Sequence, residues 1–530
     1  MEAAPAFGFR SVSDRLGWWN AYFIAKLALF ALGLMGFHLV ENLVFVVVLG
    51  AMAAPRFRRL RPWLGVPVAI ALAYYDSWLP GLSRVISQAG LVAGFSGAYL
   101  AELAGRFVSV KALVAIAAAV AGYLAAKRFV RLDVLVVIAM LVLPFVVGGP
   151  PKMMTPVTTT AAAQGDAPKG VAAQKSPDAM LADFFKTEQS RAVSFTKPPD
   201  GSPDFDVIFL HVCSLSWDDL EATGEDKHPL FATFDILFRR FNSVATYSGP
   251  AAIRFLRSPC GQPSHKALYE PTQPQCLLMP DLQKAGLEPQ LLMNHDGHFD
   301  NFLKVVRDQG VSVEPQSLKG VPAPMRAFDD SRIYDDGAIL AQWLQARVKN
   351  PAPRAAVYYN TLSLHDGNVL QSDPKPKSSE TYKKRVNKLL TDIQGFMDKL
   401  AASGRRAIVV LVPEHGAAWR GDAMQIAGLR EIPTPAITLI PVGVRVIGPD
   451  AKRVGDAVTV PDPTSFLALS HVVSKMLAKP PFGAGGFKPA DYTAGVPLTD
   501  FVSEGANATI LARGKGYVIR QDQDPWKEFQ

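Results

Sequence analysis

The chain has 530 residues, a formal net charge of +8 and a mean hydropathy of +0.13, and it is too long for one ordinary domain. The positive charge argues little for nucleic-acid binding, because many basic residues fall in short loops between apolar segments and no basic stripe with interleaved aromatics is visible. The composition instead indicates two different parts of the chain. The first is apolar up to about residue 150, and the second has the composition of a globular domain beyond about residue 200.

Five apolar runs in the first part approach the ~20 residues that cross a bilayer as a helix. They lie at 20–37, 38–54, 63–80, 112–126 and 132–148. A further stretch, 81–107, is more typical of an amphipathic helix at the membrane interface, because it carries Arg84, Ser87, Gln88, Glu102 and Arg106. The sequence therefore predicts an α-helical membrane domain over residues 1–150, with five transmembrane helices and one interfacial helix.

The basic residues predict the orientation of these spans, because Lys and Arg concentrate in cytoplasmic loops. They form three groups, before the first run, between the second and third, and between the fourth and fifth: Arg10 and Arg15; Arg56, Arg58, Arg59 and Arg61; Lys127, Arg128 and Arg131. With five spans all three groups face the cytoplasm, so everything after residue 148 lies in the periplasm. The first run lacks a small-residue cleavage site, and we expect a multi-pass protein of a bacterial inner membrane.

Two carboxylates, Glu41 and Asp76, lie within or at the ends of these runs. An ionised carboxylate is costly there unless it is paired or near the interface. Either an interfacial position or a contact with a lipid head group would explain them.

Residues 151–204 are rich in Pro, Ala, Thr, Lys and Ser and predict a periplasmic linker, with one short possible helix at 182–189. From residue 205 to 530, strand-like runs alternate with helical segments. The clearest are strands at 205–212, 407–413 and 435–444 and helices at 382–403 and 464–477. This alternation predicts an α/β domain with a mainly parallel sheet covered by helices, in which ligands bind at the carboxyl ends of the strands.

The chain has three cysteines, and a periplasmic location permits disulfides. Cys260 and Cys276 flank a short loop dense in Pro and polar residues, which suits a local bridge. Cys213 is left over, directly after the strand at 205–212. It is either a buried inert thiol or a ligand of a zinc ion, which would hold and protect a periplasmic thiolate.

Ser248 stands before Gly-Pro and a helix-compatible stretch, so it can occupy a helix N-terminus. Such a position favours a phosphate group, and a hydroxyl there can act as a nucleophile, although a plain N-cap serine fits the same pattern. Glu414 and His415 end a second strand and are followed by a glycine. Cys213, Ser248, Glu414 and His415 together form a plausible tetrahedral zinc set that would activate the serine.

Two near-matching His-Asp-Gly triplets add further candidates, His295 with Asp296 and His365 with Asp366. A single His-Asp pair is usually structural, but two in one domain favour a functional role. His365 could act as acid or base or bind phosphate oxygens, and His295 and Asp296 are candidates for substrate binding. Arg430 and Tyr247 are weaker candidates for holding a transferred phosphate.

Several of these segments resemble a known family. They are HVCSLSWDDLE (211–221), YSGPAAIRFLRSPCGQPSH (247–265), MNHDGHFDNFL (293–303), SLHDGN (363–368) and PEHGAAWRGDAMQIAGLREIP (413–433). They are similar to the phosphoethanolamine transferases of the alkaline-phosphatase superfamily and, within them, to the cellulose phosphoethanolamine transferases, the G subunit of bacterial cellulose synthesis systems. The resemblance covers nearly the whole chain, including the five-span anchor.

The resemblance implies an alkaline-phosphatase-like domain that transfers phosphoethanolamine from phosphatidylethanolamine to the 6-hydroxyls of nascent cellulose, next to other cellulose synthase subunits. It implies Ser248 as the nucleophile and Zn²⁺ held by Cys213, Ser248, Glu414 and His415. Relatives that modify lipid A carry an acidic residue, a threonine and an Asp-His pair where this chain has Cys213, Ser248 and Glu414–His415. The alternatives are phosphoethanolamine or phosphoglycerol transfer to lipid A or another glycan, and a non-enzymatic membrane subunit of the synthase assembly.

Overall fold

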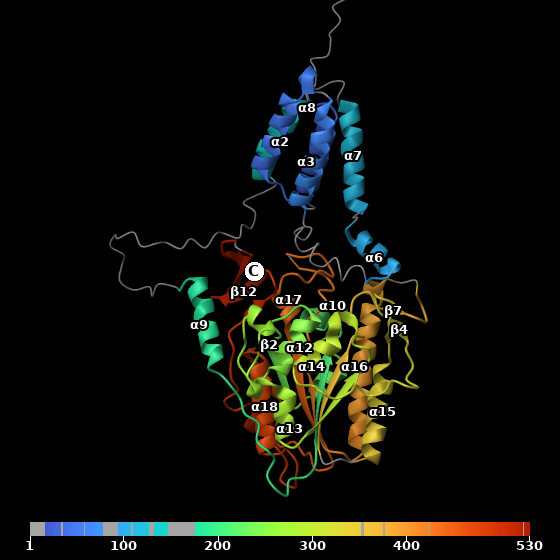
Figure 1. The fold of residues 1–530 in the computed structure, drawn as a ribbon, viewed down its shortest axis with the longest axis vertical. Helices are drawn as coiled ribbons and strands as arrows, with labels where there is room; N and C mark the ends of the chain where they lie inside the picture. Colours follow the sequence, from blue (N-terminus) through green and yellow to red (C-terminus); the bar gives the residue numbers. More distant parts are fainter. Residues whose placement is uncertain are drawn as a thin grey trace, which may run out of the picture. The chain divides into compact units, whose positions relative to one another are not determined.

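The computed structural model describes most of the chain in two compact units, Met1–Met154 and Thr155–Gln530 (Figure 1). The described residues are 16–32, 35–57, 59–77, 94–107, 110–126, 132–146, 175–350, 354–374, 377–422, 424–522 and 524–529.

Each of the five apolar runs overlaps a helix of the first unit. These are α1 (Trp19–Ala31), α2 (Leu39–Ala51), α3 (Leu60–Asp76), α7 (Val110–Ala126) and α8 (Leu132–Val146), with the short η1 (Pro55–Phe57) between α2 and α3. The longest, α3 and α7, have 17 residues. Within the described ranges, no helix combines the length and the apolar character that a membrane crossing requires. The five-span topology therefore stays a prediction.

Only the end of the expected interfacial stretch lies within the described ranges, as α6 (Gly97–Phe107). There Arg106 Nη2 lies 2.7 Å from Glu102 Oε1, one helical turn away. Outside the described residues lie Arg84, Ser87 and Gln88 of the same stretch and six of the loop cations, Arg10, Arg15, Arg58, Lys127, Arg128 and Arg131.

Asp76 is buried among α1, α2 and α3, and its charge is balanced inside the protein. Lys26 Nζ lies 2.5 Å from one carboxylate oxygen, and the Asn42 amide donates to the same oxygen at 2.8 Å. His38 Nδ1 lies 2.6 Å from the other oxygen. A buried carboxylate is tolerated when cations and donors pair with it, and the burial of Asp76 argues against a contact with a lipid head group. Its position relative to the membrane interface stays a prediction. Glu41, in contrast, is exposed on α2.

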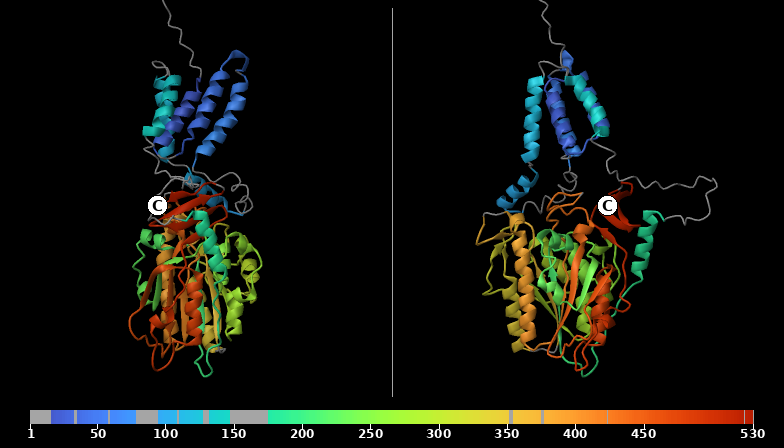
Figure 2. Two further views of the ribbon diagram at one scale, coloured as in Figure 1. Left: turned by 90° about the vertical axis from the view of Figure 1, so that its left-hand side faces the viewer. Right: turned by 180° about the vertical axis from the view of Figure 1, so that it is seen from behind.

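A seven-stranded sheet forms the centre of the second unit (Figure 2). Its strands, from one edge to the other, are β10 (Val458–Thr464), β2 (Ile236–Asn242), β9 (Leu439–Ile447), β8 (Ala407–Leu411), β1 (Asp206–Val212), β6 (Ala355–Thr361) and β3 (Glu288–Met293). The expected α/β architecture is confirmed, and the strands foreseen at 205–212 and 407–413 are β1 and β8.

The sheet is mainly parallel, as expected, and contains one antiparallel strand. β9 runs antiparallel to both of its neighbours, β2 and β8, whereas the remaining neighbours are parallel. Parallel neighbours need a crossover, usually a helix, that returns the chain to the other end of the sheet. Among the described residues between β8 and β9 the only helix is the four-residue α17 (Pro435–Thr438). Without a crossover, β9 starts at the end of the sheet where β8 finishes and runs in the opposite direction.

Helices cover both faces of the sheet. Every residue of the inner strand β1 is therefore buried, and its apolar side chains point alternately into two hydrophobic cores, one on each face. Val207 and Phe209 belong to the core with α12 (Ser248–Leu256), α13 (Leu278–Lys284), α14 (Phe302–Asp308) and α18 (Phe466–Ala478). Ile208 and Leu210 belong to the core with α10 (Trp217–Thr223), α11 (Pro229–Thr233), α15 (Asp336–Lys349) and α16 (Ser378–Ala402). The helices expected at 382–403 and 464–477 are α16 and α18.

Smaller elements complete the unit. A four-stranded antiparallel sheet contains β11 (Val502–Glu504), β12 (Ala508–Arg513), β13 (Gly516–Gln521) and β14 (Lys527–Phe529), and a three-stranded sheet contains β5 (Arg332–Ile333), β4 (Met325–Arg326) and β7 (Val369–Leu370). Short helices are η2 (Lys266–Tyr269), η3 (Pro274–Cys276), η4 (Phe299–Asn301) and α19 (Pro489–Thr493).

The end of the expected linker belongs to the second unit and packs on its four-stranded sheet. Helix α9 (Pro177–Gln189) is capped by the Ser176 hydroxyl, which accepts a hydrogen bond from the Ala179 N–H. Its side chains Leu181 and Phe184 form a core with Val502, Leu511, Val518 and Trp526 of the four-stranded sheet and its last loop. The following backbone then pairs with the 259–261 segment, since Val193 N–H donates to Pro259 O at 2.7 Å.

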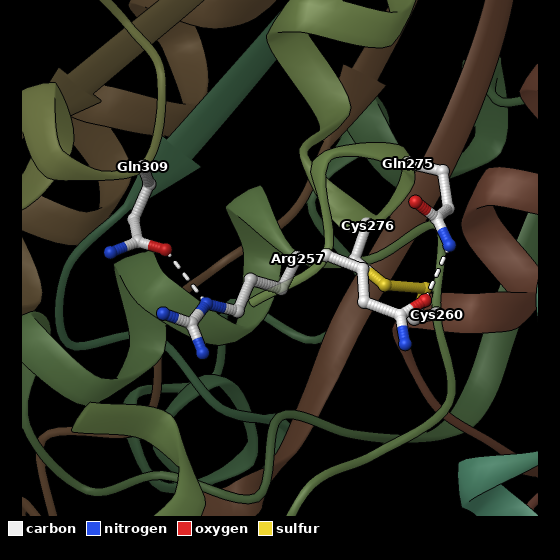
Figure 3. The surroundings of a disulfide bond; sticks show 6 residues. Arg257, Cys260, Gln275, Cys276 and Gln309 are labelled. Carbon is white, nitrogen blue, oxygen red and sulfur yellow. Dashed lines mark hydrogen bonds between the residues drawn. A yellow bond between two sulfur atoms is a disulfide. The ribbon is translucent and has the colours of Figure 1, made fainter. Parts of the chain in front are cut away.

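The expected disulfide between Cys260 and Cys276 is present (Figure 3) and closes a loop that follows the C-terminal end of α12 in the chain. Arg257, in the same region, donates from Nε to Gln309 Oε1 at 2.7 Å and from Nη2 to Glu270 O at 3.1 Å. The Arg257 guanidinium therefore links the disulfide loop, through Glu270, to the end of α14, through Gln309.

Replacing both Cys260 and Cys276 by alanine is expected to lower the free energy of unfolding of the second unit by about 3 kcal/mol, because the open loop gains conformational freedom in the unfolded chain. Urea unfolding of the purified full chain measures the change. A reductant should destabilise the natural chain to the same extent and leave the double variant unaffected. An unchanged midpoint in the variant would show that the bridge contributes nothing to stability.

Candidate active site

Three side chains converge at the carboxyl ends of the neighbouring strands β1 and β8. Cys213 directly follows β1, and Glu414 and His415 follow β8. Backbone bonds hold the two segments together, because the Glu414 N–H donates to Val212 O at 2.8 Å and the Leu215 N–H donates to His415 O at 2.6 Å. In the described part of the chain, one ligand atom from each of the three side chains lies within 4.8 Å of the others.

Ser248 joins this group as the first residue of α12. Its Oγ lies 3.4 Å from Cys213 Sγ, and the residue is only 5% exposed. Tyr247, the N-cap, makes no capping bond with its side chain. The first backbone N–H groups of a helix favour an anion, so the hydroxyl, the three ligand groups and an anion-binding helix end meet at one point.

The four side chains fit a tetrahedral zinc ion. Ligand atoms bound to such an ion lie roughly 3.3–3.6 Å apart. Besides the 3.4 Å contact between sulfur and hydroxyl, His415 Nε2 lies 3.9 Å from Cys213 Sγ and 3.7 Å from Glu414 Oε2. Glu414 Oε2 is buried and has no hydrogen-bond partner among the described residues, as expected of an oxygen kept for a metal.

The electrostatics of this group also call for a cation. Burial, and then the negative charge of Glu414, raise the pKa of the Cys213 thiol to about 12. Burial likewise raises the pKa of Glu414 and lowers the pKa of His415 well below its usual range. Burial thus opposes the charged forms of the thiol and the carboxyl, whereas a divalent cation favours thiolate and carboxylate and suits a neutral imidazole.

Further residues orient the ligands. His415 Nδ1 lies 2.8 Å from Gly416 O, and a donating Nδ1–H leaves the lone pair of Nε2 for a metal. The Asn360 amide donates to Glu414 Oε1 at 2.6 Å, which leaves Oε2 facing the other candidate ligands. Cys213, Ser248, Glu414 and His415 are called the ligand group below. His295, expected as a substrate-binding residue, lies behind Asn360: its Nε2 is 2.8 Å from Asn360 Oδ1, and its Nδ1 accepts from the Gly297 N–H.

Asp219 fixes the loop that follows the two β8 ligands. It is buried and accepts hydrogen bonds from the Ala417 N–H at 2.7 Å and from the Trp419 N–H at 3.1 Å. A Cβ atom on Gly416 would lie 2.8 Å from the same carboxylate, so only glycine fits between loop and helix.

His365 and Arg430 lie at the edge of the ligand group. His365 Nδ1 is 2.7 Å from Asp366 O, which leaves Nε2 as a proton acceptor. Burial, and then the charge of Arg430, lower the pKa of His365 to about 4, so the ring is neutral at neutral pH. Arg430 donates to Ser214 Oγ at 3.1 Å, and its guanidinium lies 5.6 Å from the centre of the Tyr247 ring.

The other predicted site residues are farther from the ligand group or point elsewhere. The Tyr247 hydroxyl donates to Glu431 Oε1 at 2.5 Å. Asp296 is exposed and accepts from the His298 N–H, and no contact joins it to the ligand atoms in the described ranges.

Sequence reasoning missed Asn360, Ser214 and Asp219. A polar side chain near the end of an apolar strand was a usable signal for Asn360 in AVYYNT, by the same argument that selected Cys213. Ser214 carries a positive φ of 63°, which no sequence pattern indicates. Asp219 has the sequence signature of a capping box with Ser216, but its bonds to residues 417 and 419 depend on the fold.

Comparisons with known proteins place the whole chain in one family. The family model "Cellulose biosynthesis protein BcsG C-terminal domain" matches residues 161–526, and "Cellulose biosynthesis protein BcsG N-terminal domain" matches residues 19–145. The cellulose biosynthesis protein BcsG of Escherichia coli K12 is 39% identical, over 97% of this chain and 96% of that protein. The protein of the same name from Salmonella typhimurium LT2 is 40% identical, over 95% and 94%.

Solved structures give more distant similarities. A protein of the alkaline phosphatase superfamily from Vibrio parahaemolyticus is 13% identical, with a TM-score of 0.47, over 67% of this chain and 88% of that one. The integral membrane lipooligosaccharide phosphoethanolamine transferase A of Neisseria meningitidis is 14% identical, with a TM-score of 0.39, over 89% and 94%.

Proposed function

The chain belongs to the BcsG family of cellulose biosynthesis proteins, and we propose that it is a zinc-dependent phosphoethanolamine transferase. In this proposal Ser248 takes phosphoethanolamine from phosphatidylethanolamine and passes it to the 6-hydroxyls of nascent cellulose in the periplasm. The family name of the relatives supports the polymer, and the chemistry of the site supports the transfer.

One observation carries the proposal: the Ser248 hydroxyl lies 3.4 Å from the free thiol of Cys213, at the start of a helix and beside Glu414 and His415. A capping role does not explain the serine, because the N-cap of α12 is Tyr247 and Ser248 is the first helical residue. A nucleophile that attacks a phosphodiester needs groups that remove its proton and an environment that binds the phosphate.

The first half of the reaction forms a covalent adduct. When bound, zinc would supply a Lewis acid that favours loss of the Ser248 proton and balances the negative charge of the phosphate. Ser248 Oγ attacks phosphorus, the bond from phosphorus to the glyceride oxygen breaks, and diacylglycerol leaves with a proton. The N–H groups of the α12 N-terminus and the Arg430 guanidinium stabilise the charge on the phosphate oxygens.

The second half returns the serine. A cellulose hydroxyl attacks phosphorus, the Ser248–phosphorus bond breaks, and Ser248 takes up a proton. His365 is the proposed acceptor of the proton of the attacking hydroxyl, because its Nδ1 is held by Asp366 O and its Nε2 can accept. Its pKa of about 4 keeps the ring unprotonated at neutral pH and also makes it a weak base. A neutral imidazole at a phosphate site is the form that acts as a general base.

The first unit is proposed to anchor the enzyme in the inner membrane. Its helices expose large apolar side chains to a degree that is unusual for protein in water. They include Val40, Val44 and Val47 of α2, Trp63 and Ile70 of α3, Val134 and Leu135 of α8, and Leu113 and Val114 of α7. An anchor of this kind would keep the second unit near a lipid donor and near the cellulose synthase subunits, which raises the effective donor concentration.

The direct test compares cellulose made by cells with and without this chain, in the presence of all other synthase subunits. We expect phosphoethanolamine on the glucose units only when the chain is present, detected by phosphorus NMR of the polymer and by mass spectrometry of its cellulase fragments. Phosphoglycerol on the polymer, or phosphoethanolamine on lipid A and none on cellulose, would replace the proposed donor or acceptor. Identical unmodified polymers would favour a non-enzymatic subunit.

A further inference from the structure

Phe299 and Asp300 lie next to residues of the proposed active site, His365 and Gly249 respectively. Asp300 Oδ2 lies 3.4 Å from the position that a Cβ atom on Gly249 would occupy, and Gly249 follows Ser248 in the first turn of α12. One residue earlier, the Phe299 ring lies 5.4 Å from the His365 ring, measured between centres. Asp300 is therefore next to the helix turn that carries the nucleophile Ser248, and Phe299 is next to the proton acceptor His365. The Asp300 carboxylate lies at the edge of the proposed active site.

The Asp300 carboxylate has no partner of opposite charge. Within the described ranges it makes no hydrogen bond and no ion pair, and its side chain is exposed enough for a ligand to reach it. Partial burial raises its pKa, with no cation acting against that effect. Nearby acids on the same segment are engaged: Asp296 accepts from the His298 N–H, and Asp308 pairs with Lys304 at 2.6 Å.

An uncompensated carboxylate beside a phosphate site is unfavourable unless the ligand also carries a positive charge, because two anions at such short range repel. The backbone N–H groups of the α12 N-terminus and the Arg430 guanidinium attract an anion, whereas the Asp300 carboxylate attracts a cation. Phosphoethanolamine has the matching pattern, a phosphate and an ammonium group joined by two carbons. A glycerol or another neutral head group has no positive charge to pair with the Asp300 carboxylate.

We propose that Asp300 binds the ammonium group of the transferred head group and thereby selects a zwitterionic donor over one with a neutral head group. The inference rests on the proposed function and deepens it by naming the residue that recognises the head group. Asp300 is a specificity residue: the bonds at phosphorus are made and broken by Ser248 and the two alcohol oxygens.

The test measures head-group preference in the full chain, purified in detergent with zinc present. Two chromogenic donors are used, the para-nitrophenyl diesters of phosphoethanolamine and of phosphoethylene glycol, which differ only in an ammonium or a hydroxyl group. In both, Ser248 Oγ bonds to phosphorus, the bond to the nitrophenyl oxygen breaks, and nitrophenolate leaves. The readout is the ratio of kcat/KM for the charged donor to that for the neutral donor.

Asp300→Asn is expected to lower this ratio about tenfold, the usual worth of a hydrogen bond to a charged group. The substitution keeps the backbone, because Asp300 has a φ of 50° and asparagine adopts that left-handed region readily. Asp308→Asn is the matched control, since it removes the same charge from the exposed end of α14 and should leave the ratio unchanged.

The possible outcomes separate the two proposals. A ratio in Asp300→Asn within twofold of the natural chain, while both esters are still cleaved in a Ser248-dependent way, overturns the ammonium site and leaves the transferase intact. An equal loss of ratio in Asp308→Asn also overturns it, because any negative charge would then suffice. No Ser248-dependent cleavage of either ester by the natural chain would overturn the proposed function and this inference together.

Discussion

Replacing Ser248 by alanine is expected to abolish phosphoethanolamine transfer, with a fall in rate of about a thousandfold or more. The change removes the atom that forms the covalent bond to phosphorus. Ser214 Oγ also lies near the metal ligands, 3.3 Å from Cys213 Sγ, but it accepts a hydrogen bond from Arg430 and does not begin a helix, so we do not expect it to replace Ser248. The loss should appear both in polymer modification and in cleavage of a chromogenic phosphodiester.

The covalent intermediate gives a second and independent measurement. After incubation with phosphatidylethanolamine and no acceptor, the tryptic peptide with Ser248 should carry one phosphoethanolamine group by mass spectrometry, and the alanine variant should carry none. Ser317→Ala, which changes an exposed serine away from the site, serves as control and should keep both activity and adduct. Full activity in Ser248→Ala would remove the serine from the mechanism, and an unchanged thermal unfolding profile would exclude misfolding as the cause of a loss.

The sequence predicted much of the second unit, because the signals for its central elements are local. β1 contains the apolar run 207–210, β8 is apolar throughout, and α16 has a long amphipathic pattern, so each could be recognised without knowledge of its neighbours. The direction of β9 could not, because its pairing depends on which end of the sheet the chain has reached after residue 411. The same holds for the packing of α9 on the four-stranded sheet, whose strands follow more than 300 residues later.

The candidate site was predictable to the extent that its residues stand at element ends. Cys213 and Glu414 follow strands and Ser248 begins a helix, and parallel strands bring such ends together. The supporting residues were not predictable, because their function lies in a contact: Asn360 acts on Glu414, 54 positions away, and Asp219 acts on Ala417, 198 positions away. His295 was selected for its residue type and its neighbours in the sequence. Its ring nitrogens are hydrogen-bonded to Asn360 and Gly297, so it helps to hold Asn360, which in turn holds Glu414.

Removing a ligand of the metal is expected to have an effect as large as that of the serine variant. Cys213→Ser replaces a thiol by a hydroxyl that ionises far less readily, and Glu414→Gln replaces a carboxylate by a neutral amide, so each should weaken zinc binding by more than about a hundredfold. Zinc content after dialysis of the full chain, measured by mass spectrometry of the metal, should fall from about one ion per chain to near none. Activity should fall with it, and excess zinc should restore part of the activity in both variants.

A graded series distinguishes ligands from their supports. Asn360→Ala leaves all four ligand groups in place but frees Glu414 Oε1 from its amide donor, so zinc affinity should fall by about 10–100-fold, less than in either ligand variant. His298→Ala is the control for loss of a histidine, because that side chain is 89% exposed and should leave the zinc content unchanged. Retention of a full zinc ion by both Cys213→Ser and Glu414→Gln would contradict the ligand set. The anion-binding helix end and Arg430 would then have to activate Ser248 without it.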